Sequence, residues 1–180
     1  MEEEEILESL GDKNLRRAVF EKVVKQYTRM LYWKIRRMVI DYDDANDVLQ
    51  NTFLKSWTAL DSFRGESKIS TWLYKIAINE SLCFLEKKKN THVESLDDCE
   101  NPLVGKLQSS PYIDANEVEI KLQKAILTLP DRQRLVFNLR YYDEMKYAEM
   151  SELLNTSESS LKASYHFAAK KVEEYLRNHD

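Results

Sequence analysis

Glycine and proline are scarce in this chain, with three of each among 180 residues. Strands and hairpins need turn residues in larger supply, so the shortage disfavours a β-rich fold. The apolar content of 43% is high enough for packed cores and disfavours wholesale disorder. The composition therefore predicts an all-α protein, built as one domain or as two small helical domains.

Long apolar runs are also missing. No stretch approaches the length of a membrane span, and the N-terminus opens with Glu2 to Glu5 where a targeting segment would carry a basic region and then an apolar one. These features predict a cytoplasmic protein with no membrane insertion.

Cysteine is rare, and the common signs of catalysis are missing. Cys83 and Cys99 flank His92 at irregular spacing and lack a fourth ligand, so we expect no metal site and no cofactor. Cys83 falls within an apolar helical pattern, which predicts a small buried thiol in its reduced form. No Ser/His/Asp arrangement, carboxylate pair or phosphate-cradling glycine loop is found, so we expect no enzymatic activity.

An excess of positive charge is lacking too, because the formal net charge is −4. A protein that binds DNA unaided usually has a basic domain whose lysines and arginines displace counterions from phosphates. This balance favours a weak intrinsic DNA binder that works as a subunit of something larger. Positive charge is instead local, at Arg64, Lys68, Lys75, Lys87 to Lys89, Lys162, Lys170 and Lys171.

What the chain does have is helical periodicity. In its first half, apolar residues recur at three- and four-residue steps over Asn14 to Ile40, Asp43 to Ser62 and Thr71 to Leu85. Ser70 or Thr71 is expected to cap the third helix. The second helix is expected to bury one stripe, formed by Ala45, Val48, Leu49, Leu54 and Trp57 with Phe53 beside them.

A polar loop from Phe63 to Ser70 joins the second and third helices. It contains Gly65, two basic residues and hydroxyls that can bond phosphate or a base edge. Phe63 and Trp72 can hold such a loop rigidly, and we favour anchoring over base stacking as the role of Trp72. On composition alone, a solvated loop between two helices explains the segment equally well.

The second half begins after a change of character over Asn90 to Ala115, where prolines, a glycine and acidic residues replace the periodic pattern. Asp131 and Ser157 are expected to cap helices. The last two expected helices, joined at Asn155-Thr156, have the outline of a helix-turn-helix, which many helical hairpins share. Helices are expected over Glu117 to Leu129, Arg132 to Tyr142, Lys146 to Leu154, and from Ser157 to about Leu176.

Three motifs, D-x-x-D-V-x-Q-x-x-F-x-K-x-W from Asp44, F-R-G from Phe63 and W-L-Y-x-I-A-x-N from Trp72, resemble region 2 of the sigma-70 family. More narrowly, they resemble its extracytoplasmic-function (ECF) group. The motif L-P-x-x-Q-R-x-V-F-x-L-R-Y from Leu129 resembles the opening of region 4. The resemblance implies a region 2 domain over 1–94, a flexible linker over 95–115 and a region 4 helix-turn-helix domain over 116–180.

The function that this resemblance implies is transcription initiation. An ECF sigma factor binds core RNA polymerase, recognises a promoter at its −35 and −10 elements, and stabilises the opened strand. The implied polymerase contacts are Asp44, Asp47, Gln50, Asn51, Phe53, Leu54 and Trp57. The implied −10 contacts are Arg64, Gly65, Ser67, Lys68, Ser70, Thr71, Trp72, Lys75 and Asn79.

The final helix departs from the usual family pattern. Many members place Gly-Thr and later Arg here, whereas this chain has Ser159-Ser160, Ser164 and Phe167. We therefore expect less bidentate guanine readout and more hydroxyl, apolar and shape contact. Leu161, Tyr165 and Ala168 are expected on or near the apolar side. The candidate −35 contacts are Ser157, Ser159, Ser160, Lys162, Ala163, Ser164, His166, Phe167, Lys170 and Lys171.

Two other classes of function compete with this one. A stand-alone helix-turn-helix regulator would bind DNA without polymerase, and the acidic balance argues against it. A helical adaptor would leave the segment from Arg64 to Asn79 without a role. The family resemblance further implies an anti-sigma factor as a partner and a monomer outside the holoenzyme.

Overall fold

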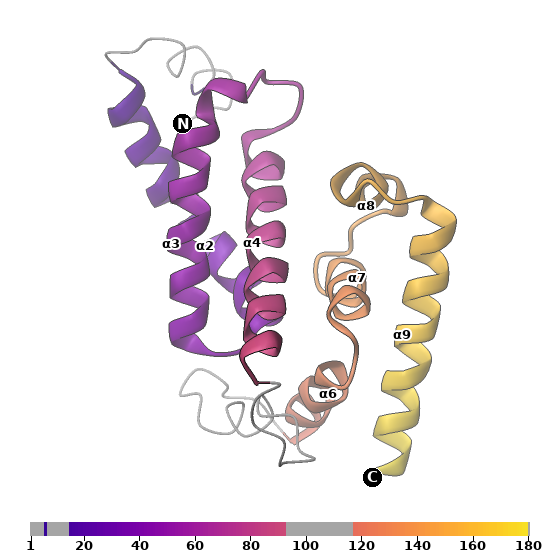
Figure 1. Ribbon diagram of the computed structural model, residues 1–180. Coiled ribbons are helices and arrows are strands. Elements are labelled where there is room, and N and C mark those ends of the chain that lie inside the picture. The colour runs from indigo at the N-terminus through magenta and orange to yellow at the C-terminus, as the bar shows by residue number, and fades with distance from the viewer. Residues whose placement is uncertain (1–5, 7–14, 93–116, 180) are drawn as a thin grey trace. The chain divides into compact units, whose positions relative to one another are not determined.

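The structure is a computed structural model that describes Ile6 and residues 15–92 and 117–179 (Figure 1). In this part of the chain every regular element is a helix, which confirms the predicted all-α fold. The chain divides into two units: Met1–Val39 with Asp43–Phe84, and Ile40–Tyr42 with Leu85–Asp180. Each unit is described by itself below.

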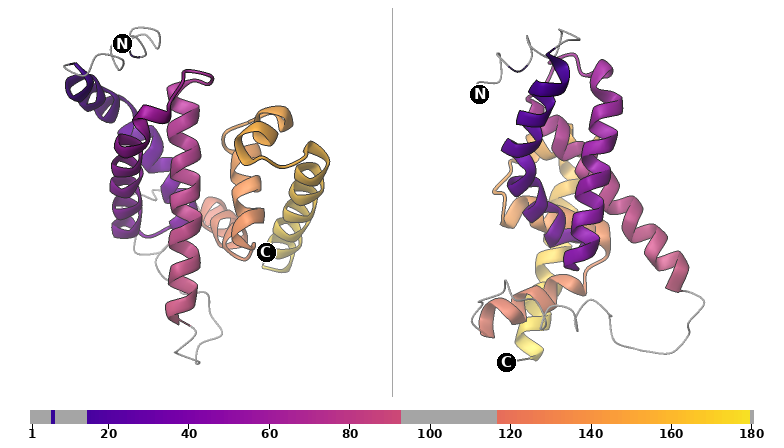
Figure 2. Two further views of the ribbon diagram at one scale, coloured as in Figure 1. Left: turned by 45° about the horizontal axis from the view of Figure 1, so that its top comes forward. Right: turned by 90° about the vertical axis from the view of Figure 1, so that its left-hand side faces the viewer.

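Three long helices build most of the first unit, and they lie side by side (Figures 1 and 2); the third runs past Phe84, where the first unit ends. They are α2 (Arg16–Val39), α3 (Tyr42–Ala59) and α4 (Ile69–His92), and a short 3-10 helix, η1 (Leu60–Ser62), follows α3. Their apolar residues recur once per turn and meet in a shared core, as the sequence pattern predicts. That core includes Val23, Leu31, Ile35, Ala45, Val48, Ile69, Leu73 and Ala77.

The inner face of α3 is completed by hydroxyls. Thr52 and Ser56 are fully buried. The Thr52 hydroxyl donates to the Val48 carbonyl at 2.7 Å, and the Ser56 hydroxyl donates to the Thr52 carbonyl at the same distance. Each buried hydroxyl thus forms a hydrogen bond within its own helix, so neither is left as an unpaired buried polar group.

These hydroxyls overturn part of the predicted apolar stripe. Leu54 is 64% exposed and Trp57 is 40% exposed, so the prediction that both are buried is wrong. The reason is the helical period: after Val48 and Leu49, the inward positions fall at Thr52 and Ser56. The large apolar side chains of the last two turns therefore lie outside the inner face.

Two predictions about α4 also need correction. The helix begins at Ile69, a fully buried residue, so Ser70 and Thr71 lie in its first turn instead of capping it. Cys83 is an exposed free thiol and not a buried one. Ser81 and Leu85, four residues apart, take the inward positions, which leaves Cys83 on the outer side.

Four helices build the second unit: α6 (Glu117–Leu127), α7 (Asp131–Tyr141), α8 (Tyr147–Leu154) and α9 (Glu158–Asn178). The last of them, α9, contacts each of the other three. Leu161 and Ala168 of α9 are buried and Tyr165 is half-buried against Phe137, with ring centroids 5.7 Å apart, which confirms their predicted position. The core includes a cluster of Ala125, Ile126, Leu129, Phe137, Ala168 and Val172.

The turn between α8 and α9 is built from local polar contacts. Asn155 ends α8 in the left-handed conformation, with φ of 50°, which asparagine tolerates better than most residues. Ser157 caps α9 as predicted, because its hydroxyl oxygen accepts a bond from the Ser160 amide at 3.3 Å. The predicted helix-turn-helix is therefore present.

A buried arginine sits at the start of α7. The Arg134 side chain is 2% exposed, and its guanidinium donates to the Asp131 carboxylate at 2.5 Å. Asp131 was expected to cap α7, but it lies inside the helix, where it pairs with Arg134; Pro130 precedes the helix without a side-chain capping bond. Burial lowers the pKa of Arg134, and the charge of Asp131 partly opposes this shift.

We predict that Asp131→Asn destabilises the second unit by about 3 kcal/mol, because it leaves a buried guanidinium without its carboxylate. Arg134→Met should cost less, since it removes the buried charge and keeps most of the volume. Urea denaturation of the full chain, followed by circular dichroism, compares the two variants. An equal loss of stability in both would show that the ion pair does not govern this site.

Candidate functional site

The loop between η1 and α4 is fixed at both ends by an aromatic contact. The rings of Phe63 and Trp72 lie 4.9 Å apart at 36°. Between them Gly65 has φ of 72°, a left-handed conformation that glycine adopts without steric cost. The two rings and the glycine together set the path of a short polar segment whose residues 64–68 are all exposed.

This loop encloses a pocket of about 260 Å³. One wall is aromatic, from Phe63 and Trp72, and the rest carries a guanidinium, a carboxylate and two hydroxyls. Such a lining offers a planar ligand a surface to stack on together with donors and acceptors at its edge. The lining residues are Ser62, Phe63, Arg64, Glu66, Ser67 and Trp72.

Three of the predicted −10 residues, Arg64, Ser67 and Trp72, line this loop pocket. Ser62 and Glu66 also line it and were not among the predicted −10 residues. A carboxylate in that position can accept a bond from an amino group. Their neighbours in the sequence could have indicated both: Glu66 directly follows Gly65, and Ser62 directly precedes Phe63.

Other predicted −10 residues extend the loop pocket along α4. Lys68, Thr71, Lys75 and Asn79 are exposed, and their spacing of three and four residues places them on one face. This set, the α4 stripe, is polar along its whole length. Of the remaining predicted −10 residues, Gly65 is exposed and Ser70 is half-buried.

The predicted polymerase contacts form a second surface on α3. Exposed residues recur along one side of the helix, and Leu54 and Trp57 provide apolar area among polar neighbours. Large exposed apolar side chains grouped with polar ones are typical of protein-binding surfaces. Asp44 and Phe53, predicted as part of this set, are half-buried. The α3 face consists of Asp47, Gln50, Asn51, Leu54 and Trp57.

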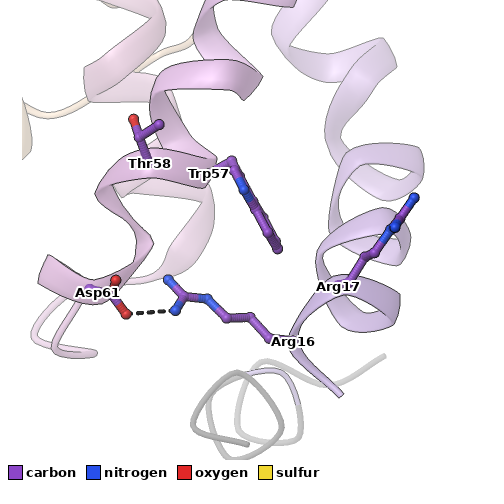
Figure 3. A pocket seen from close by; sticks show the side chains of 5 residues that line it. All are labelled: Arg16, Arg17, Trp57, Thr58 and Asp61. Atoms are coloured by element: carbon purple, nitrogen blue, oxygen red, sulfur yellow. Dashed lines mark hydrogen bonds and ion pairs between the residues drawn. The ribbon is translucent and has the colours of Figure 1, made fainter. Parts of the chain in front are cut away.

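A larger pocket, of about 480 Å³, lies at the C-terminal end of the α3 face (Figure 3). Arg16 from α2 pairs with Asp61 from η1 at 2.6 Å, and its guanidinium lies 5.6 Å from the centre of the Trp57 ring. Arg17 and Thr58 complete the lining. Sequence reasoning missed Arg16 and Asp61 because 45 residues separate them and neither belongs to a local motif.

The predicted −35 residues lie on α9. All of them are exposed except Ser164, which is half-buried. Phe167 is 57% exposed, and its ring lies 5.9 Å from that of His166. Ala163, Phe167 and Lys170 follow one another at steps of four and three residues, so they share a face on the side away from the core. At the start of α9, the Ser157 hydroxyl also contacts those of Ser159 and Ser160.

Neither a membrane span nor a metal site is found in the parts of the chain that the structure describes. No described helix has the length and apolarity needed to cross a bilayer. Among residues 15–92 and 117–179, no three His, Cys, Asp or Glu side chains gather as potential metal ligands.

Each half of the chain matches a protein-family model. The model of sigma-70 region 2 matches residues 23–91, and that of sigma-70, region 4 matches residues 119–172. The ECF RNA polymerase sigma factor SigM of Bacillus subtilis is 32% identical over 146 residues, which cover 79% of this chain and 86% of SigM. SigW of the same organism is 29% identical over 167 residues, with 88% and 89% covered.

Two solved structures share the fold. The sigma factor RpoE of Bartonella quintana, in complex with the anti-sigma factor NepR, has a TM-score of 0.67 at 20% identity, covering 88% of this chain and 96% of RpoE. CnrH, in complex with the cytosolic domain of CnrY, has a TM-score of 0.69 at 20% identity, with 99% of each chain covered. Both comparisons support the all-α architecture.

We predict that Trp72→Ala loosens the loop without unfolding the unit. An aromatic pair contributes about 0.5–1.5 kcal/mol beyond its buried area, so amide protection over residues 63–69 should fall by about two- to tenfold. Trp72→Phe keeps a ring against Phe63 and should retain most of the protection. Hydrogen exchange read by mass spectrometry makes the comparison, and equal protection in the wild type and the alanine variant would mean that the ring contact does not hold the loop.

Proposed function

The chain belongs to the ECF group of the sigma-70 family, and we propose that it binds core RNA polymerase and directs it to a promoter with separate −35 and −10 elements. The observation that carries this proposal is the presence of both sigma-70 regions, in order, in a single chain. A stand-alone helix-turn-helix regulator is not favoured, because region 2 would then have no role.

We assign polymerase binding to the α3 face. Leu54 and Trp57 supply the apolar area that would be buried, and Asp47, Gln50 and Asn51 supply hydrogen-bonding groups around it. Binding energy at such a surface concentrates in a few large side chains, so Trp57 is the candidate anchor. The adjacent pocket, with Arg16 paired to Asp61, gives a partner side chain a charged cavity next to that anchor.

We assign capture of the melted −10 element to the loop pocket. Opening a duplex costs stacking and pairing energy, and a protein offsets this cost by holding an unstacked base in a pocket and the strand on basic residues. Trp72 and Phe63 offer the stacking wall, while Arg64, Glu66 and Ser67 can bond the edge of the base. The α4 stripe then offers Lys68 and Lys75 to the phosphates.

We assign the −35 element to α9. In a helix-turn-helix the second helix enters the major groove with its N-terminal end, where α9 presents the Ser157, Ser159 and Ser160 hydroxyls. Lys170 and Lys171 lie farther along and can contact phosphate. The exposed Phe167 cannot bond a base edge, but its ring can contact the 5-methyl group of a thymine.

The charge balance supports a protein that depends on its polymerase. A chain with a net charge of −4 gains little from counterion release, so its own affinity for DNA should be weak until polymerase adds further contacts. We infer that it acts in the cytoplasm, makes or breaks no covalent bond, and is a monomer outside the holoenzyme. Because the structural neighbour RpoE was solved in complex with the anti-sigma factor NepR, we also infer that an anti-sigma factor binds this chain.

Core polymerase binding and transcription test the proposal together. Tagged full-length protein should retain core bacterial RNA polymerase, and the mixture should yield a new run-off transcript from the DNA upstream of its own gene. A shift of that DNA by the protein alone, with no retention of polymerase, would support the stand-alone regulator instead. Retention without any new transcript from genomic DNA would contradict the role in initiation.

We predict that readout of the −35 element depends on thymine methyl groups through Phe167. Replacing thymine by uracil removes one methyl, worth about 0.8 kcal/mol when buried, so holoenzyme affinity should fall about fourfold at the contacted position. Phe167→Ala should bind both duplexes equally, whereas His166→Ala should still discriminate between them. Competition binding with synthetic promoters measures both effects, and equal affinity of the wild type for the two duplexes would contradict the prediction.

A further inference from the structure

Most of the positive charge of helix α2 has no role in the assignments above. Helix α2 contains eight lysines and arginines and a single acidic residue, Glu21. The chain as a whole is acidic, with a net charge of −4. Like charges three or four residues apart on a helix repel each other, so this distribution opposes helix stability and calls for a partner of opposite charge.

Beyond the first turn, the exposed part of this charge lies on one side of α2. Lys22, Lys25, Arg29 and Trp33 are exposed and follow one another at steps of three, four and four residues. The buried residues Val23, Leu31 and Ile35 occupy the opposite side. We call the four exposed residues the α2 stripe, which is about 16 Å long at 1.5 Å per residue.

Its cations are available to a partner. Among the residues that the structure describes, Lys22, Lys25 and Arg29 make no ion pair, in contrast to Arg16 and Arg17 at the start of the same helix. Three unpaired cations on one face form a site for a chain of anionic groups with regular spacing.

The aromatic member of the stripe points to the kind of polyanion. Trp33 is 41% exposed, and the edge-on ring of Tyr32, 5.4 Å away, supports it. A base in a duplex hides both of its faces in the stack, whereas a base in a single strand can stack on an exposed ring. A basic stripe that includes an exposed Trp therefore matches single-stranded nucleic acid better than a duplex or an acidic protein surface.

The stripe also begins close to the loop that leads to the loop pocket. Arg16, in the first turn of α2, pairs at 2.6 Å with Asp61 of η1, directly before the loop (Figure 3). Lys22 follows Arg16 by about 9 Å along the helix. Six residues turn the helix by about 600°, which puts Lys22 about 120° around the axis from Arg16, so a strand that leaves the loop pocket passes around the start of α2 to reach the stripe.

From these observations we infer that the α2 stripe is a second binding track for single-stranded DNA. Lys22, Lys25 and Arg29 bind phosphates, and Trp33 stacks on a base of the strand whose −10 segment occupies the loop pocket. The inference rests on the proposed function for the source of the strand. It extends the protein's contact with the opened promoter from the loop and α4 to α2. The protein should therefore protect a longer segment of the single strand than the loop and α4 would cover alone.

Fluorescence anisotropy of the full chain with a labelled 20-mer of thymidine, and with a duplex of equal length, tests the track. Trp33→Ala should lower affinity for the single strand about tenfold, in line with the loss of one base stack, and leave the weak duplex affinity unchanged. Trp33→Phe should retain most of the affinity. Changing Lys22, Lys25 and Arg29 together to Gln should reduce the salt dependence of single-strand binding by about two in log–log slope.

Control measurements separate this inference from the proposed function. Arg177→Gln, which removes an exposed cation near the C-terminal end of α9, should change neither affinity. Equal losses of affinity for single strand and duplex in Trp33→Ala would reveal a general polyanion site and overturn the inference.

Loss of core polymerase binding by the stripe variants would assign the surface to protein contact and also overturn the inference. Single-strand binding that follows the prediction in a protein without any initiation activity would instead overturn the proposed function and leave the track in place.

Discussion

The contact between Phe63 and Trp72 is the interaction on which the candidate site depends. It joins the end of η1 to the first turn of α4, so a loop that includes a left-handed glycine follows a single path. The same two rings form the apolar wall of the loop pocket, which means that one contact both fixes the loop and creates the surface for stacking. A looser loop would have to order itself at the cost of conformational entropy whenever it captured a base.

A second constraint decides which residues of α3 remain available for binding. Because Thr52 and Ser56 satisfy their hydroxyls within the helix, α3 packs against its neighbours through small side chains and does not use Leu54 or Trp57 for its core. The unit thus buries two hydroxyl side chains while two large apolar side chains stay exposed, the reverse of the usual preference. This exposed apolar area makes the α3 face suitable for a large partner, and the acidic total charge is the reason we propose that tight DNA binding requires one.

Much of this arrangement could be predicted from the sequence, because helices with a clear period and a motif at fixed spacing depend on local information. The helices, the Ser157 cap and the helix-turn-helix were predicted on that basis. The wrong predictions came from tertiary packing: Leu54 and Trp57 fit an apolar period that the bundle does not use, and Cys83 lies outside the inward positions. Asp131 has a side chain suited to capping a helix, but its carboxylate pairs with the buried guanidinium of Arg134. The pair of Arg16 with Asp61 joins distant segments, and no local pattern contains it.

We propose that the loop pocket holds one unstacked base of the opened promoter. The most direct measurement places the fluorescent base 2-aminopurine at successive positions of the −10 non-template strand in complexes with holoenzyme. We expect one position to differ from its neighbours, with its emission quenched against the aromatic wall, and we expect Trp72→Ala to remove this difference. A uniform rise in emission at every position, unchanged by Trp72→Ala, would contradict base capture by this pocket.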